Sequence, residues 1–283
     1  MPYLKGHSDH KVSLWSVLKD SVGKEIWKIT VPVLFNEPLG LLQKGAGSTE
    51  FLDILDVAIA ESDEMKRFAL VAVHQLVQYT TIERCGLAKP FNPLLGETFE
   101  YVVPGKFQFL GEQVSHHPPI SAFHILGDSG YLKYSTFNTK TSFGIGTIGF
   151  ANIFHEHIEL MPHGETFEWS PPGLGFHGLI MGSPYMEIEG TGTLRDVKKP
   201  LEKYATVRYH KKGWIHANEQ HKVEGEVFSA KGQIAFKIEG KWSDEIYLKD
   251  LRLGPDSAPE LIWKKSPYPE NWQYMYGMTH HGL

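Results

Sequence analysis

Residues 99–136 read FEYVVPGKFQFLGEQVSHHPPISAFHILGDSGYLKYST, and they carry the clearest strand and turn signals of the chain. Short runs of aromatic and aliphatic residues are separated by turn-forming Gly, Pro, Asp and Ser, which is the pattern of β-strands joined by tight turns. The tetrapeptide GDSG at 127–130 fits a hairpin turn better than the nucleophile loop of a serine protease. The runs predict four strands: Phe99–Val103, Phe107–Leu110, Ala122–Leu126 and Tyr131–Thr136.

The same pattern continues towards the C-terminus. It predicts four more strands: Ile153–Leu160, Tyr204–Tyr209, Val223–Phe228 and Gln233–Glu239. Many short strands at close spacing favour an antiparallel sheet that curls or closes. Several of them look apolar on both faces, which indicates a barrel with an apolar interior wide enough to leave room for a ligand.

Three helices are predicted upstream of the strands, at 13–28, at about 48–63 and at about 63–85, where Gly86 gives a stop signal. The fold class is therefore mainly β with N-terminal helices, an α+β arrangement. The helix at 13–28 is amphipathic, with Leu14 and Leu18 on its apolar face and Trp15 beside them. This pattern fits either a helix that packs on a core or one that touches an anionic membrane surface.

Length and composition limit the classes of protein. A chain of 283 residues with 41% hydrophobic content can bury a sizeable core, and since no linker or repeat divides it, we expect a single domain over 1–283. The net charge of −5 argues against a general nucleic-acid binder. The only cysteine, Cys85, cannot form an internal disulfide, which fits a reducing compartment.

No signal sequence, long apolar span or lipidation motif is apparent. We therefore expect a cytoplasmic monomer whose membrane contact is transient and peripheral.

The run EQVSHHPP at 112–119 indicates an anion site. His116 and His117 each offer hydrogen-bond donors, and a neighbouring phosphate favours their protonated form. Pro118 fixes its own φ and biases His117 towards an extended conformation, so both rings lie on stiff backbone.

This run resembles the signature of the oxysterol-binding-protein-related lipid-transfer family, and other blocks resemble that family in the same order. They are SLWSVLKD at 13–20, VPVLFNEPL at 31–39 and KPFNPLLGETFE at 89–100, with fainter similarity at 224–227 and 239–242. The resemblance covers nearly the whole chain.

The resemblance implies a large incomplete antiparallel β-barrel with a central lipid tunnel. Residues 1–30 would form a helical lid, with Leu14, Trp15 and Leu18 at the tunnel mouth. Residues 31–97 would form a helical segment, and 98–283 the barrel.

The implied function is non-vesicular lipid transfer: one tunnel binds a sterol or phosphatidylinositol 4-phosphate and exchanges them between membranes without catalysis or a cofactor. The residues that would hold the phosphoinositide head group are Lys89, Asn92, His116 and His117. Gln75 or Gln78 would meet the sterol hydroxyl. We expect transient contact with anionic membrane surfaces.

Two departures from the family pattern stand out. After WQYMYG at 272–277 the chain ends at Leu283, whereas family domains continue with a C-terminal helical segment that supplies further phosphate ligands. FGIG at 143–146 stands where the family has a Phe-Trp-Gly pattern.

Two alternatives stay open. A static sensor would bind the same lipids without moving them between membranes. A metal-dependent enzyme would use His155 and His157, which share one face of a strand with Glu159. Such residues on a solvated strand face are commoner than a metal site, so we expect no metal.

Overall fold

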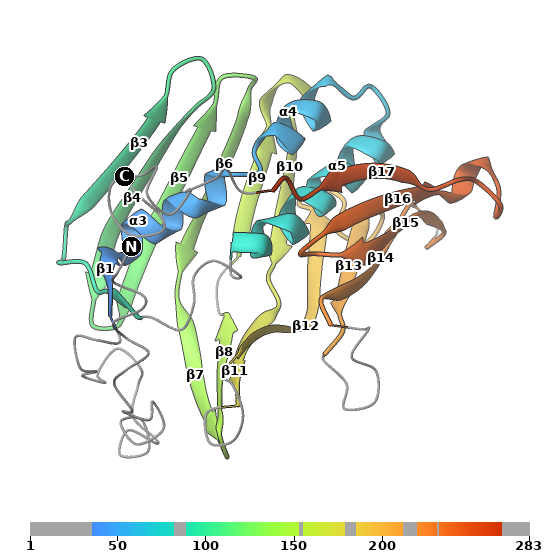
Figure 1. The fold of residues 1–283 in the computed structure, drawn as a ribbon. Coiled ribbons are helices and arrows are strands. Elements are labelled where there is room, and N and C mark those ends of the chain that lie inside the picture. Colours follow the sequence, from blue (N-terminus) through green and yellow to red (C-terminus); the bar gives the residue numbers. More distant parts are fainter. Residues whose placement is uncertain are drawn as a thin grey trace.

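The computed structural model describes residues 36–81, 89–152, 155–178, 185–211, 220–230 and 232–267. These residues form one large antiparallel sheet with helices against it (Figure 1), so the predicted fold class is confirmed. The helices are α3 (Leu41–Gly45), η4 (Ala46–Thr49), α4 (Asp53–Ala60), α5 (Glu64–Val77), η5 (Gln78–Thr80), η6 (Met161–His163) and η8 (Leu251–Leu253). The strands are β1 (Asn36–Gly40), β2 (Lys89–Phe91), β3 (Thr98–Val103), β4 (Phe107–His116), β5 (Pro119–Gly127), β6 (Tyr131–Phe137), β7 (Thr139–Gly144), β8 (Thr147–Asn152), β9 (Glu156–Leu160), β10 (Glu165–Ser170), β11 (Gly173–His177), β12 (Tyr185–Asp196), β13 (Tyr204–Tyr209), β14 (Lys222–Phe228), β15 (Ile234–Lys241), β16 (Glu245–Asp250) and β17 (Glu260–Lys264).

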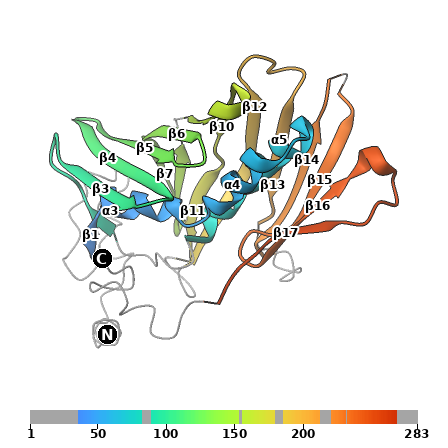
Figure 2. The same cartoon turned by 90° about the horizontal axis from the view of Figure 1, so that it is seen from above.

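The strand order is β17-β16-β15-β14-β13-β12-β10-β9-β6-β5-β4-β3, and a branch of β7, β8 and β11 joins it at β12. β1 and β2 form a separate parallel pair. Figure 2 shows the sheet curving around α4 and α5. Among the described strands, β3 and β17 do not pair with each other, so the curved sheet stays open.

The four strands predicted within 99–136 are all present, and two of them are much longer than predicted. β4 continues to His116 and β5 begins at Pro119, because residues on both sides of the histidine turn pair with each other. Seven strands of the large sheet were not predicted: β7, β8, β10, β11, β12, β16 and β17. β11 shows why, since its sequence GLGFH has little β-propensity and its extended form depends on pairing with both β8 and β12.

The expectation of strands that are apolar on both faces is wrong for β4. Its side chains alternate between buried and exposed from Phe107 to Val114. The helices lie against only one face of the sheet, so the other face meets solvent. The inner face therefore holds the core and any ligand.

Helix α5 is buried on nearly all sides, since every residue from Arg67 to Val77 is buried. It begins at Asp63, whose side chain caps the helix by accepting hydrogen bonds from the backbone N–H groups of Met65 at 2.9 Å and Lys66 at 3.1 Å. Of the helix predicted for 63–85, α5 covers Glu64–Val77 and η5 covers Gln78–Thr80, and residues 82–88 lie outside the described ranges.

Buried charges fix the start of α5 to the sheet. Arg67 Nε lies 2.6 Å from a carboxylate oxygen of Glu165. Lys203 Nζ lies 2.6 Å from Glu64, 2.9 Å from Asp196 and 3.1 Å from Glu165. Burial lowers the pKa of Lys203, but the three carboxylates outweigh burial and hold this pKa above its ordinary value. These contacts join α5 to β10 and to the β12–β13 connection.

No helix in the described parts of the chain is both long and apolar enough to cross a bilayer.

Candidate functional site

The turn between β4 and β5 is shaped by side-chain hydrogen bonds. The Gln113 amide donates to the Ser115 carbonyl at 2.8 Å and accepts from the Ser121 hydroxyl at 2.5 Å. The Ser115 hydroxyl donates to the carbonyl of Pro118 at 2.7 Å. Gln113 and Ser121 are almost fully buried, so the hydrogen bond between them is shielded from water, whereas the Ser115 bond is exposed. The polar residues of the EQVSHHPP run therefore hold the turn itself.

A β-bulge in β4 sets the direction of His116. Gln113 pairs with Ser121 whereas His116 pairs with Pro119, so three steps along β4 match two steps along β5. Cross-strand partners lie on the same face of a sheet. His116 therefore shares the inner face with Gln113 and Ser121, whereas simple alternation would place it on the outer face.

The two imidazole rings lie together at the end of the sheet. Their centroids are 4.9 Å apart, with the ring planes at 70°. His116 is half-buried, and its Nδ1 is buried without a hydrogen-bond partner in the described part of the chain. His117 is exposed. A buried nitrogen without a hydrogen-bond partner lowers the stability of the fold unless a ligand or a water molecule bonds to it.

Lys89 and Asn92 lie on and just after β2. Lys89 is half-buried, and burial lowers the pKa of its ammonium group. Asn92 is exposed. Helix α3 packs against both β2, which carries Lys89, and β4, which carries His116. The two strands therefore border the same helix. Among the described residues, no hydrogen bond or ion pair joins Lys89 to either histidine.

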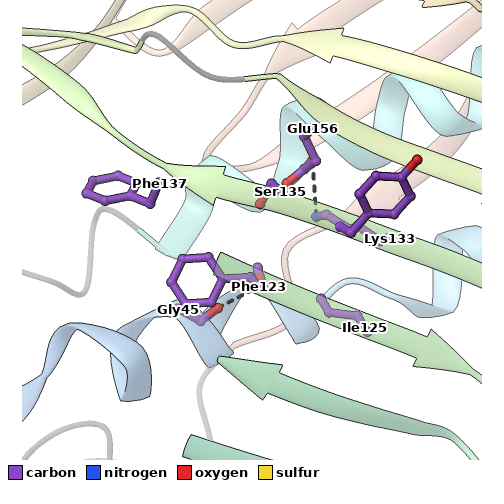
Figure 3. A pocket seen from close by; sticks show the side chains of 9 residues that line it. Gly45, Phe123, Ile125, Lys133, Ser135, Phe137 and Glu156 are labelled. Atoms are coloured by element: carbon purple, nitrogen blue, oxygen red, sulfur yellow. Dashed lines mark hydrogen bonds and ion pairs between the residues drawn. The ribbon is translucent and has the colours of Figure 1, made fainter. Parts of the chain in front are cut away.

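A pocket of about 140 Å³ lies on the inner face of the sheet (Figure 3). It is smaller than the ~300–1,000 Å³ of typical small-molecule sites, so it suits one end of a ligand. The predicted tunnel for a whole lipid stays a prediction. The pocket is lined by Gly45, Ser48, Phe123, Ile125, Lys133, Tyr134, Ser135, Phe137 and Glu156.

A buried ion pair lines this pocket. Lys133 Nζ lies 3.3 Å from Glu156 Oε1, and both residues are buried (Figure 3). Behind the pair, Lys133 donates to the side-chain oxygen Oε1 of Gln78 at 3.0 Å, and the Gln78 side-chain Nε2 donates to Glu156 at 3.3 Å and to Gln75. Gln75 is fully buried, and its Nε2 has no partner in the described part of the chain. The two glutamines chosen from the sequence thus belong to one polar network at the pocket.

His74 completes this network in its neutral form. Complete burial, together with the adjacent Lys133 ammonium, lowers the pKa of His74 well below 6.5. Nδ1 lies 3.1 Å from the Phe51 carbonyl, and Nε2 lies 3.4 Å from Lys133 Nζ. The neutral ring therefore donates through Nδ1–H to the carbonyl and accepts from the ammonium at Nε2.

This protonation state predicts acid sensitivity. Below about pH 6.5 the unfolded chain protonates His74 and the folded chain does not, so stability falls as the pH falls. Between pH 6.5 and pH 5.5 this residue should cost about 1 kcal/mol of unfolding free energy. Urea denaturation of the natural chain and of His74→Gln at both pH values measures the difference. A stability gap that does not change with pH would contradict the neutral assignment.

The pocket and the histidine turn share one face of the sheet. Ile125 lines the pocket, and Pro119 pairs with His116; both lie on the inner side of β5. Six residues separate them, which is about 20 Å at ~3.4 Å per residue. The inner face thus carries two polar regions at a separation that suits an elongated amphiphile.

The residues of the proposed metal enzyme do not gather as ligands. His155 lies outside β9, and the His155 and His157 rings approach Glu168 at 3.6 Å and 3.4 Å. Glu159 accepts a hydrogen bond from Tyr134 at 3.2 Å instead. These contacts follow from the pairing of β9 with β10 and with β6, on the partly exposed outer face of the sheet. In the described ranges, one group brings three ligand atoms within 4.8 Å of one another: His177, Glu187 and Glu189.

The three lid residues Leu14, Trp15 and Leu18 lie outside the described residues. Conversely, the sequence interpretation missed Lys133 and Glu156. Both interrupt the apolar alternation of their strands at inward positions, and this signal would have found them.

Comparison with known proteins gives a consistent result. Residues 13–283 match the family profile described as oxysterol-binding protein. Oxysterol-binding protein homolog 1 from Saccharomyces cerevisiae is 37% identical over 290 residues, covering 92% of this chain and 24% of that protein. Oxysterol-binding protein-related protein 3 from Mus musculus is 32% identical over 280 residues, covering 98% of this chain and 32% of that protein. The chain spans about a third or less of the length of these two relatives.

Solved structures share the fold. The Osh1 ORD domain in complex with ergosterol superposes with a TM-score of 0.82 at 31% identity, over 92% of this chain and 65% of that one. The Osh3 ORD in complex with PI(4)P, from Saccharomyces cerevisiae, gives 0.79 at 26% identity, over 96% and 70%.

Fold and coverage define an ORD-type domain. The chain belongs to the oxysterol-binding protein family, whose members are lipid-binding proteins rather than enzymes.

Proposed function

We propose that this domain binds a sterol or phosphatidylinositol 4-phosphate, one molecule at a time, and exchanges the two lipids between membranes. The observation that carries the proposal is the pair of polar regions about 20 Å apart on one inner face of the sheet. A lipid chain spans about half of the ~30 Å hydrocarbon core of a bilayer, roughly 15 Å. Phe137 lines the pocket and pairs with Ser121, two residues from Pro119, so a chain of this length that starts at the histidine turn would reach the apolar wall of the pocket.

The histidine turn is the proposed head-group site. A phosphomonoester carries roughly −1.5 to −2 charges near neutral pH. His116 and His117 supply donors close together, and the bulge turns His116 towards the inner face. Lys89 adds an ammonium whose pKa burial has lowered, so a phosphate would be a favourable neighbour for it. Asn92 would add a neutral donor at the exposed rim.

The pocket is the proposed site for a sterol hydroxyl. A hydroxyl both donates and accepts, and Lys133 and Glu156 offer one partner of each kind. Gln75 and Gln78 connect to this pair, and the unpartnered Gln75 Nε2 is a further donor. Phe123 and Ile125 provide the apolar walls. The related Osh1 ORD structures are complexes with ergosterol and with cholesterol, and the Osh3 ORD structure is a complex with PI(4)P, which supports both ligands.

We further propose one domain over 1–283, whose residues 1–30 act as a lid through Leu14, Trp15 and Leu18. The domain would work at the cytoplasmic surfaces of organelle membranes. Directional transport would then follow from mutually exclusive occupancy, which couples the two lipid fluxes, together with a phosphoinositide gradient between the membranes that other proteins supply.

A static sensor is the rival function. Vesicle-to-vesicle transfer separates the two functions: we expect catalytic amounts of the domain to move fluorescent sterol into acceptor vesicles that contain phosphatidylinositol 4-phosphate. A sensor would bind sterol and leave the acceptor vesicles without it.

A further inference from the structure

The longest stretch without acidic residues lies next to the histidine turn. Residues 129–155 contain no Asp or Glu, although the chain has 33 acidic residues and a net charge of −5. This stretch includes the β7–β8 hairpin, which holds Phe143, Ile145, Ile148 and Phe150. A negatively charged protein is repelled by an anionic bilayer, so a segment without carboxylates is the part that can approach one.

The tip of this hairpin exposes an aliphatic side chain. Ile145 is 95% exposed, the largest value among the exposed large hydrophobic residues in the described ranges. Gly146 beside it has φ +69°, a left-handed conformation that permits the tight turn. Such an exposed Ile has no stabilising role within the domain itself. An exposed apolar side chain at a hairpin tip can enter the apolar interior of a bilayer.

Strand register places this tip at the same end of the sheet as the histidine turn. Phe137, the last residue of β6, pairs with Ser121, two residues from the start of β5. β7 begins two residues later, and Figure 1 shows it extending away from the body of the sheet. The seven residues from Phe137 to Gly144 reach about 20 Å further at ~3.3 Å per residue.

A second apolar tip lies on the other side of the histidine turn. Leu94 is 73% exposed and Leu95 is 66% exposed. The turn that carries them is held to β4 by two backbone hydrogen bonds, from Gly96 N–H to the Gln113 carbonyl at 2.9 Å and from Gln113 N–H to the Glu97 carbonyl at 3.0 Å. In the order of the sheet, the histidine turn therefore lies between two exposed apolar tips.

We propose that the β7–β8 hairpin is a membrane-contacting element that inserts Ile145 into the bilayer, with the Leu94–Leu95 turn as a second point of contact. The partner is a bilayer surface rather than a protein, because two separate small tips flank a site for a lipid head group. This inference rests on the proposed function. Insertion of Ile145 would bring the histidine-turn end of the sheet towards the bilayer, and contact at the Leu94–Leu95 turn would bring the histidines themselves close to its surface.

The test compares Ile145→Asp with a matched control, Leu201→Asp. Leu201 is 81% exposed and lies shortly after Asp196, the last residue of β12. The pairing of β6 with β9, of β9 with β10 and of β10 with β12 places Asp196 near the Tyr131 end of β6. This end of the sheet is opposite the histidine turn. Sedimentation with vesicles of phosphatidylcholine and phosphatidylserine should show at least about tenfold weaker binding for Ile145→Asp. The Leu201→Asp variant should bind like the natural chain. Unchanged binding of Ile145→Asp, or equal loss in both variants, would overturn the proposal.

A second measurement does not depend on a disruptive charge. Single cysteines replace Ile145 or Leu201 in a chain carrying Cys85→Ser, and each is labelled with an environment-sensitive dye. The dye at 145 should shift to the blue on mixing with the same vesicles, and the dye at 201 should not; no shift at 145 would refute insertion.

Binding of dehydroergosterol delivered from cyclodextrin, without vesicles, should be equal in the natural chain and in Ile145→Asp. This readout keeps the two claims apart. Failure of the natural chain to bind the sterol would count against the proposed function, whereas vesicle binding alone decides the role of Ile145.

Discussion

Replacing both His116 and His117 with alanine should abolish phosphoinositide binding while sterol binding stays unchanged. Each imidazole would make a charge-assisted hydrogen bond to the phosphate, worth about 1.5–3 kcal/mol. Loss of two such bonds weakens binding at least about 100-fold. The sterol is unaffected because its proposed polar contact lies about 20 Å away, at the pocket. Extraction of each lipid from vesicles measures the two effects separately.

His124→Ala is the matched control. His124 lies on β5, the strand that follows the histidine turn. It is exposed on the outer face of the sheet, so it cannot contact a ligand on the inner face. This variant should extract both lipids normally. Equal loss of both lipids in the double variant would point to disruption of the fold, and unchanged phosphoinositide extraction would remove the head-group site from the account.

Replacing Lys133 with methionine should destabilise the domain strongly. Glu156 is only 7% exposed, so removal of its partner leaves a buried carboxylate without a counter-charge. The expected loss is about 3–5 kcal/mol of unfolding free energy. A second change, Glu156→Leu, should restore most of it, because two apolar side chains replace the pair. This double variant should still lose sterol affinity, roughly tenfold, since the sterol hydroxyl has no partner there.

A second ion pair of the same length gives the control. Lys264 Nζ lies 3.3 Å from Glu245, but the side chains are 63% and 32% exposed. Lys264→Met should therefore cost no more than about 1 kcal/mol in the same urea denaturation series. If Lys133→Met costs as little as Lys264→Met, the pair at the pocket is solvated and cannot form a dry site for a hydroxyl.

The fold was predictable where local pattern and tertiary pairing agree. The runs that became β3 to β6 are bounded by strong turn signals, and the GDSG turn lies where it was expected. β11 and β12 contain glycines at positions that only the neighbouring strands explain. At Gly192, for example, an added Cβ would lie 2.2 Å from the ring of Trp169. Contacts of this kind are invisible in a single sequence.

The site was predictable as residue types but not as geometry. The histidine pair was found from its sequence motif, yet a β-bulge in β4 determines which face of the sheet His116 lies on. The alternation of apolar and polar residues along the strand does not reveal such a one-residue shift in register. Lys133 and Glu156 are far apart in the sequence, and the pairing of β6 with β9 brings them together. Gln75 and Gln78 lie within the helix predicted for 63–85, and the same strand pairing gives them their charged neighbours.

The most direct test of the account is competition between the two lipids for one molecule of the domain. The domain is loaded with dehydroergosterol and titrated with vesicles that contain phosphatidylinositol 4-phosphate, and native mass spectrometry counts the lipids bound. We predict complete release of the sterol, with one phosphoinositide taken up for each sterol lost. A species that holds both lipids at once, or sterol that stays bound while the phosphoinositide is taken up, would contradict a single shared site.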